Sequence, residues 1–380
     1  MSKSKRVGAI DFWRGAVLIA ILVDHIPGNL LENLTPRNFG LSDSAEAFVF
    51  LSGLSVGMIY LPRAQKRGWW EAARACLKRA LKLYGVHIAL TLSALAIFAC
   101  AYWLSGVEDF IQAHGRSFVF GQPATGLIGL GLMSLQIGYF NILPLYVVLM
   151  LWAPLALAIA MRRPALALAG SIALYAASRL AGLRLPNWPE PGTWFFNPLA
   201  WQLIFTLGLI AAIAWRNGPP KPSRGLVIVA STILGLSAIA ATGALGLFPG
   251  LRDASFGWLD VSKQDLGLAR LVHFAALAYL VAIAPGLTRL VDGVAGRAIQ
   301  ALGRNGLPVF AAGSIVSALG QALLGVGANH FSVRVEHWAG FAYTLGGIAV
   351  LFFLARWIEC RTPPATPSRP AFGDAVPQGN

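Results

Sequence analysis

Four ionisable residues bracket one apolar segment near the start of the chain, RVGAIDFWRGAVLIAILVDHIPGN. Asp11 and Arg14 precede an uninterrupted apolar run, and Asp24 and His25 follow it. At a helical rise of ~1.5 Å per residue, the distance from Arg14 to His25 is roughly 16 Å, about half of a hydrocarbon core. An ionisable side chain inside a membrane is costly and usually faces a polar cavity, so this segment is a candidate functional site.

A histidine at the end of this segment suits proton transfer. An imidazole titrates near pH ~6.5 in water, so His25 can take a proton from an attacking hydroxyl as a general base. The alternative is structural, with Asp24 and His25 capping a helix in the headgroup region. Asp24 points about 100° away from His25 around a helix, so we expect it to face another partner, such as Arg37.

Two acids, Asp43 and Glu46, begin the next apolar segment, SDSAEAFVF. Their i, i+3 spacing places them on one helix face or at its N-cap. We expect Asp43 to cap the helix, and we also count it among the candidate substrate-binding residues. Glu46 lies deeper in the apolar run, so we assign it to the site as a carboxylate that orients His25, with capping as its alternative.

Composition places most of the chain in a membrane. Hydrophobic residues make up 56% of the 380 residues, and charged residues only 12%. A typical soluble domain has ~25% charged residues. We therefore expect an all-α polytopic membrane protein with about ten transmembrane helices. The predicted spans are 8–27, 45–61, 83–104, 139–161, 165–181, 197–215, 226–247, 266–284, 307–325 and 337–357.

The segments outside these spans carry further predictions. Residues 63–82 are strongly basic and predict an amphipathic helix at the membrane interface. Residues 105–138 form a polar excursion whose apolar part, 124–138, is a candidate re-entrant segment. We expect residues 1–360 to form one integral-membrane domain and 361–380 to form a disordered cytoplasmic tail.

The distribution of the basic residues indicates how the chain is oriented in the membrane and does not indicate nucleic-acid binding. The net charge is +14, but the Lys and Arg residues stand between apolar runs and not in a stripe with exposed aromatics. With both termini in the cytoplasm, most of them fall on the cytoplasmic side, as the positive-inside rule requires. Arg14 then lies toward the cytoplasm and His25 toward the outer face. The three cysteines have no metal-site spacing, so we expect no bound metal.

Six segments in order carry a family resemblance: DFWRGAVLIAILVDHIPGN, LTPRNFGLSDSAEAFVFLSGLSVGM, YFNILPLYVVLMLWAP, WFFNPLAWQLIFTLG, KQDLGLARLVHFAALAY and LGRNGLPVF. They resemble the landmarks of the OpgC family, the membrane succinyltransferases of osmoregulated periplasmic glucans. That family is similar in plan to the wider acyltransferase family 3. The resemblance implies a multi-pass protein of the bacterial inner membrane. It implies transfer of an acyl group, with succinyl as the leading choice, from cytoplasmic acyl-CoA to a sugar hydroxyl outside.

The resemblance also implies that His25 is the catalytic base. Asp24 and Glu46 are further catalytic candidates because of their positions in the two segments described above. Acyl-CoA is then a co-substrate, and no tightly bound cofactor is expected. Cations must hold its phosphates, and Arg14, Arg79 and Lys82 lie on the predicted cytoplasmic side. For these basic residues, topology or lipid contact is the alternative. The pantetheine arm would bridge the distance from the phosphates to His25.

Four further polar residues occur in apolar surroundings at the predicted outer side: Asn141, Asn197, Gln202 and His273. They are candidates for binding a periplasmic glucan or for donating hydrogen bonds to the oxyanion of acyl transfer. Interhelical hydrogen bonding is the alternative for each of them.

Two patterns bear on other function classes. The segment Gly53-Leu-Ser-Val-Gly57 matches a nucleophile elbow, but that motif needs a strand–turn–helix context, so we interpret it as GxxxG helix packing. A transporter of a sugar or a lipid-linked intermediate is the alternative function. A transporter should carry charges at the midplane of several helices, whereas here they gather on the first two spans and the basic segment after them.

Overall fold

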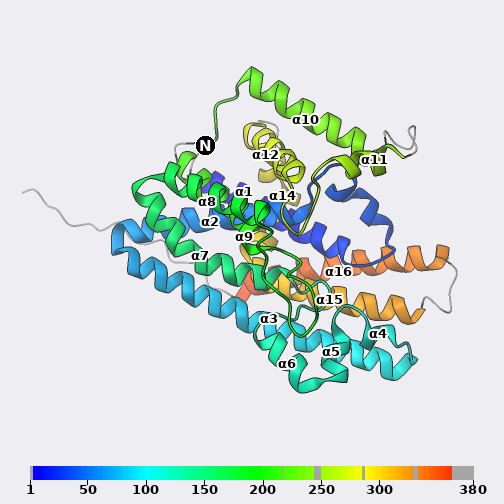
Figure 1. Cartoon of the computed structure of the whole chain (residues 1–380). Coiled ribbons are helices and arrows are strands. Elements are labelled where there is room, and N and C mark those ends of the chain that lie inside the picture. Colours follow the sequence, from blue (N-terminus) through cyan, green and yellow to red (C-terminus); the bar gives the residue numbers. More distant parts are fainter. Residues whose placement is uncertain (1–2, 217, 244–249, 285–286, 328–332, 362–380) are drawn as a thin grey trace, which may run out of the picture.

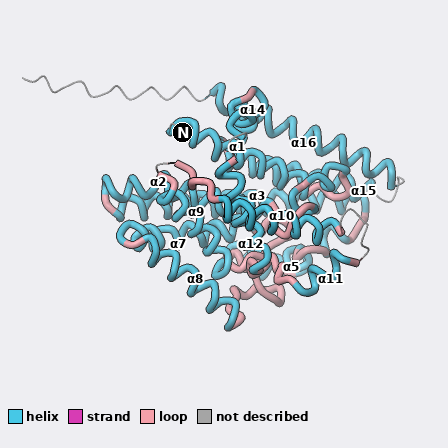
Figure 2. The backbone as a smooth tube through the Cα atoms, turned by 90° about the horizontal axis from the view of Figure 1, so that it is seen from above, coloured by secondary structure: helices cyan, strands magenta, loops and turns pink. Residues whose placement is uncertain are grey.

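The chain folds into a bundle of helices (Figure 1). The computed structural model describes residues 3–216, 218–243, 250–284, 287–327 and 333–361. Within those ranges the regular elements are helical, which confirms the all-α prediction for this part of the chain, and loops make up the remainder (Figure 2). The long helices are α1 (Lys3–Asp24), α2 (Ser44–Arg67), α3 (Trp69–Ser105), α7 (Ile142–Arg162), α8 (Pro164–Leu180), α9 (Pro198–Ala214), α10 (Arg224–Thr242), α12 (Leu268–Ile283), α15 (Gly306–Gly327) and α16 (Val333–Arg361).

Short helices connect the long ones. They are α4 (Asp109–Gln112), α5 (Arg116–Gly121), α6 (Pro123–Gly131), α11 (Leu251–Trp258), α13 (Leu287–Asp292) and α14 (Val294–Arg304). Two 3-10 turns, η1 (Leu30–Leu34) and η2 (Pro36–Asn38), lie between α1 and α2. The predicted re-entrant segment contains α6, which has nine residues. At ~1.5 Å per residue α6 is too short to cross a hydrocarbon core of ~30 Å.

Length and composition allow six of the described helices to cross a membrane: α2, α3, α7, α10, α15 and α16. Three shorter apolar helices, α8, α9 and α12, have 10–17 residues each. Helix α1 has 22 residues and contains the charged residues Asp11, Arg14 and Asp24. Every predicted span overlaps one of these ten helices, but their number as transmembrane spans stays a prediction. The predicted disordered tail, apart from residue 361, lies outside the described residues.

One predicted element is wrong. The basic segment 63–82 does not form a separate interfacial helix, because residues 63–67 end α2 and residues 69–82 begin α3. Gly68 separates the two helices with a φ of +89°, a conformation that glycine tolerates well. After Gly68, the run of Ala, Leu, Lys and Arg favours one continuous helix into the apolar segment.

Glycines bring α2 and α9 into backbone contact. A Cβ atom added at Gly53 would overlap the carbonyl oxygen of Phe205, and one added at Gly208 would overlap the carbonyl oxygen of Phe50. Gly57 lies against Ala212 and Leu209 in the same way. The GxxxG interpretation of Gly53 and Gly57 is therefore confirmed.

A second close contact positions α1. The sequence did not predict α14, which packs across the first half of α1. Gly15 of α1 lies against the carbonyl of Ile299, and Gly303 of α14 lies against the backbone of Asp11. Helix α15 follows α14 directly and runs alongside α1 in the same direction. Gly306 contacts Arg14 at one end, and Gln321 bonds His25 at the other.

Replacing Gly53 or Gly208 by Ala should each lower the free energy of unfolding by about 1–3 kcal/mol, because the added methyl group forces the two backbones apart. Unfolding of the purified protein in detergent micelles measures this. Gly170→Ala on α8 is the matched control, since open space surrounds that glycine. There the substitution should leave stability unchanged or raise it slightly. Equal effects at all three positions would contradict the backbone contact.

Candidate functional site

His25 follows the last residue of α1 and is held between two other elements. Its ring stacks on Tyr139, with ring centroids 4.4 Å apart and planes 23° apart. Its carbonyl oxygen accepts a hydrogen bond of 3.0 Å from Gln321 Nε2 on α15. Residue 25 therefore lies between α15, which bonds its backbone, and the loop that precedes α7, which stacks on its ring.

A small cavity of about 10 Å³ lies between α1 and α15 beside His25. Helix α1 lines it with Leu18, Ile21, Leu22 and His25, and α15 lines it with Val309, Phe310, Gly313, Ser314 and Ser317. Arg14 lies one helical turn before Leu18 on the same face of α1. We call this line of facing residues, from Arg14 and Gly306 to His25 and Ser317, the α1–α15 seam.

The seam is narrow, and one of its polar groups lacks a partner. The cavity is no larger than the ~10–15 Å³ that one water molecule needs. Ser317 Oγ is buried there without a hydrogen-bond partner among the residues that the structure describes. A buried hydroxyl without a partner carries an unfavourable desolvation cost, which a bound polar group would remove.

The guanidinium of Arg14 is fixed at the other end of the seam. It donates hydrogen bonds to Asp11 Oδ1 at 3.1 Å, to the Gly303 carbonyl at 3.2 Å and to Ser55 Oγ. Arg79 lies on α3 and is half-buried. Lys82 is exposed one turn further along α3. The candidate cations therefore come from two helices, α1 and α3.

A network of buried charges links α2 to α12 and to the loop before α12. Glu46 is fully buried, and its carboxylate accepts hydrogen bonds from Arg270 Nε at 2.6 Å and from the backbone N–H of Asp43 at 2.9 Å. Asp43 caps α2, as predicted, and accepts hydrogen bonds from Lys263 Nζ at 2.6 Å and from Arg270 at 3.0 Å. We call these four side chains the Glu46–Arg270 cluster.

The contact expected between Glu46 and His25 is not formed. Both carboxylate oxygens of Glu46 are occupied within the cluster, because a buried carboxylate needs a cation and Arg270 supplies one. The carboxylate of Asp43, which precedes the first residue of α2, is also balanced by neighbouring cations. Burial alone would raise its pKa, but Lys263 and Arg270 hold the pKa of that carboxyl well below its ordinary value.

Asp24 has the partner that its helical direction indicated. Its carboxylate lies 3.4 Å from Arg37 Nε, which confirms the expected pair. Arg37 also bonds Glu32 at 2.8 Å, so the turns between α1 and α2 hold it in place. Asp24 therefore does not need to contact the neighbouring imidazole.

The other polar candidates lie in local hydrogen-bond networks away from the seam. Asn197 donates to Ser178 Oγ at 3.0 Å and to Asp265 Oδ1 at 3.1 Å. Gln202 bonds both the hydroxyl and the carbonyl of Ser171. Asn197 and Gln202 thus make hydrogen bonds that connect helices and loops, which is the structural role given above as the alternative to glucan binding.

The two remaining candidates also have defined positions. His273 Nδ1 lies 2.7 Å from Ser42 Oγ, and both residues are buried. Asn141 precedes α7, two residues after the Tyr139 ring that stacks on His25. Sequence reasoning missed Tyr139, Ser317 and Gln321, which the fold places around His25. The small residues of LPVFAAGSIVSALGQ were the available signal for α15.

No group of three or more potential metal-ligating side chains occurs among the described residues. A family model described as OpgC protein matches residues 6–362, and this range includes the seam and the Glu46–Arg270 cluster. No curated protein matches the chain.

Replacing Arg270 by Met should lower the free energy of unfolding by about 3–5 kcal/mol, because Glu46 is left as an uncompensated buried charge. The double variant Glu46→Gln/Arg270→Met removes that charge and should recover most of the loss. Unfolding in detergent micelles measures both.

The matched control for this pair is Arg74→Met, which removes an exposed ion pair with Glu71. Exposed pairs contribute little, so this variant should unfold like the wild type. A double variant no more stable than Arg270→Met would show that the cluster does not act through charge balance.

Proposed function

Because the chain belongs to the OpgC family, we propose that it is a membrane O-acyltransferase that acts on a glucan. Family membership supports a transferase of this general kind. The proposed donor is acyl-CoA in the cytoplasm, with succinyl as the first choice, and the proposed acceptor is a hydroxyl of a periplasmic glucan. The proposed location is the bacterial inner membrane, with both termini in the cytoplasm. The apolar helices and the distribution of basic residues support this location.

The observation that carries the proposal is the α1–α15 seam. It joins the Arg14 guanidinium to the His25 imidazole along one face of α1, opposite the small residues Gly306, Gly313 and Ser317 of α15. A donor with phosphates at one end and a thioester at the other matches this separation of charge from base.

The cationic end of the seam would bind the phosphates of CoA. Asp11 already balances one charge at this end, so Arg79 and Lys82 of α3 would supply the further cations that the CoA phosphates need. The pantetheine arm would follow the seam, which must widen to admit it. The hydroxyl of Ser317 would then bond an amide or the thioester carbonyl of the donor, and its buried oxygen would gain a partner.

At the other end, His25 would take the proton of the sugar hydroxyl as its oxygen attacks the thioester carbonyl. The tetrahedral intermediate would collapse with loss of the CoA thiolate, which would take the proton held by His25 and return the imidazole to its neutral form. Tyr139 and Gln321 would keep the imidazole and its backbone in place. The Asp24–Arg37 pair lies next to His25 and remains a candidate for orienting that end of α1.

Replacing His25 by Ala should reduce acyl transfer about 10²–10⁴-fold, because the hydroxyl loses its proton acceptor. The assay follows acyl transfer from succinyl-CoA to extracted glucans by the purified protein in liposomes. His337→Ala, at an exposed position on α16, is the matched control and should retain activity. Wild-type activity in a folded His25→Ala protein would contradict the assignment of His25 as the base.

Replacing Arg14 by Ala should raise KM for succinyl-CoA about 10–100-fold, the effect of losing a hydrogen bond to a charged group. Succinyl-pantetheine, which lacks the nucleotide phosphates, should show little difference between the two proteins. The comparison separates phosphate binding from a general loss of structure. An equal loss with both donors would place the role of Arg14 elsewhere.

A further inference from the structure

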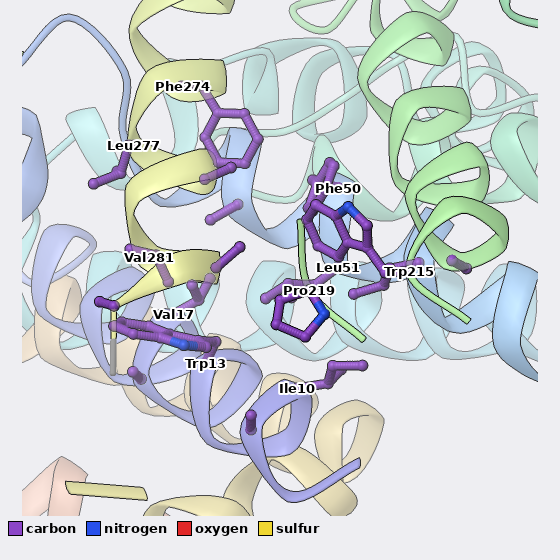
Figure 3. Close-up of a pocket in the computed structure, with 18 of the residues that line it drawn as sticks. Ile10, Trp13, Val17, Phe50, Leu51, Trp215, Pro219, Phe274, Leu277 and Val281 are labelled. Carbon is purple, nitrogen blue, oxygen red and sulfur yellow. The ribbon is translucent and has the colours of Figure 1, made fainter. Parts of the chain in front are cut away.

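A large cavity lies on the face of α1 that points away from the seam. Its volume is about 1050 Å³, and α1, α2 and α12 form most of its wall. Figure 3 shows Trp13 and Val17 of α1, Phe50 of α2, and Phe274 and Val281 of α12 around one open space. Neither Arg14 nor His25 lines it. The cavity is therefore separate from the proposed acyl-transfer site.

The cavity follows almost the whole length of α2. Its lining on this helix begins beside Asp43 and continues at every turn to Lys66. At ~1.5 Å per residue this is roughly 35 Å, which exceeds the thickness of one membrane leaflet. The walls between the two ends are apolar, with Leu51, Leu54 and Leu61 of α2 among them.

The gap exists because α12 stands away from the body of the bundle. Helix α12 packs chiefly on α10, which lies at the edge of the molecule (Figure 1). Most side chains of α10 are exposed or half-buried, with Ala230, Ser237 and Ala241 as its buried residues. The space between this helix pair and α1–α2 is too wide for their own side chains to fill.

The two ends of the cavity differ in charge. Lys66 and Arg216 line one end, both exposed, together with the carboxylate of Asp292. The other end is lined by Asp43, Ser42 and His273. There Asp43 is already paired with Lys263 and Arg270, and Ser42 is bonded to His273. An anionic group is therefore attracted to the Lys66–Arg216 end.

We propose that this cavity binds an acyl chain of an anionic phospholipid, with the phosphate of its headgroup at Lys66 and Arg216. The apolar walls match a hydrocarbon chain, and the bilayer around the protein supplies one. Basic side chains at a membrane surface attract anionic lipids by about 1 kcal/mol each. The bound chain would fill the space under α12 and hold it against α1 and α2. This proposal does not depend on the acyl-transfer reaction.

Native mass spectrometry of the full chain in detergent tests this with added phosphatidylglycerol or phosphatidylcholine. The wild type should retain one phosphatidylglycerol more tightly than phosphatidylcholine, by several-fold in occupancy. Ala278→Trp places an indole inside the cavity and should lose this lipid. Lys66→Glu/Arg216→Glu keeps the apolar walls and should lose the preference for phosphatidylglycerol.

Two variants outside the cavity are matched controls. Ala169→Trp adds the same bulk at an exposed position of α8, and Arg162→Glu/Arg163→Glu reverses two charges where α7 meets α8. Both should retain phosphatidylglycerol as the wild type does. Wild-type retention by a folded Ala278→Trp protein would overturn the site. If that protein does not fold, the exposed charge-reversal variant decides, and an unchanged preference in it would overturn the proposal.

Discussion

A buried charge without a partner is costly, and this constraint accounts for the positions of the buried ionisable residues in this fold. The Glu46–Arg270 cluster meets the constraint by joining two carboxylates to two cations at distances of 2.6 to 3.0 Å. Asp11 and Asp24 meet it with Arg14 and Arg37. Ser317 is among the few buried polar groups of the described residues that have no hydrogen-bond partner, and it is the one that lines the small cavity beside His25.

Close backbone contacts then fix the helices that carry these groups. Gly303 allows the end of α14 to touch α1, and its carbonyl accepts a hydrogen bond from Arg14 at 3.2 Å. Gly53 of α2 and Gly208 of α9 likewise allow the backbones of these two helices to touch. In a membrane the hydrophobic effect does not drive helices together, so such glycine contacts and interhelical hydrogen bonds specify the packing.

The sequence predicted the features that depend on spacing within one helix. The Arg14–His25 interval, the Asp43 cap and the direction of Asp24 follow from helical geometry alone. It could not predict contacts between distant segments. Glu46 and Arg270 are 224 residues apart, and Ser317 reaches His25 only because α14 places α15 beside α1. The sequence therefore allows Glu46 to be interpreted as the acid that orients His25 in a triad, whereas the fold pairs it with Arg270.

Helix α1 faces two separate spaces, and this separation follows from its sequence. Arg14, Leu18 and His25 recur at helical spacing on the seam, whereas Trp13, Val17 and Ala20 line the large cavity. A single helix thus keeps the proposed path of the donor, which has Arg14 at one end and His25 at the other, apart from a space suited to lipid. In the lipid proposal, the bound chain would pack against Trp13, Val17 and Ala20. It would therefore restrain the same helix that carries Arg14 and precedes His25, without contacting either residue.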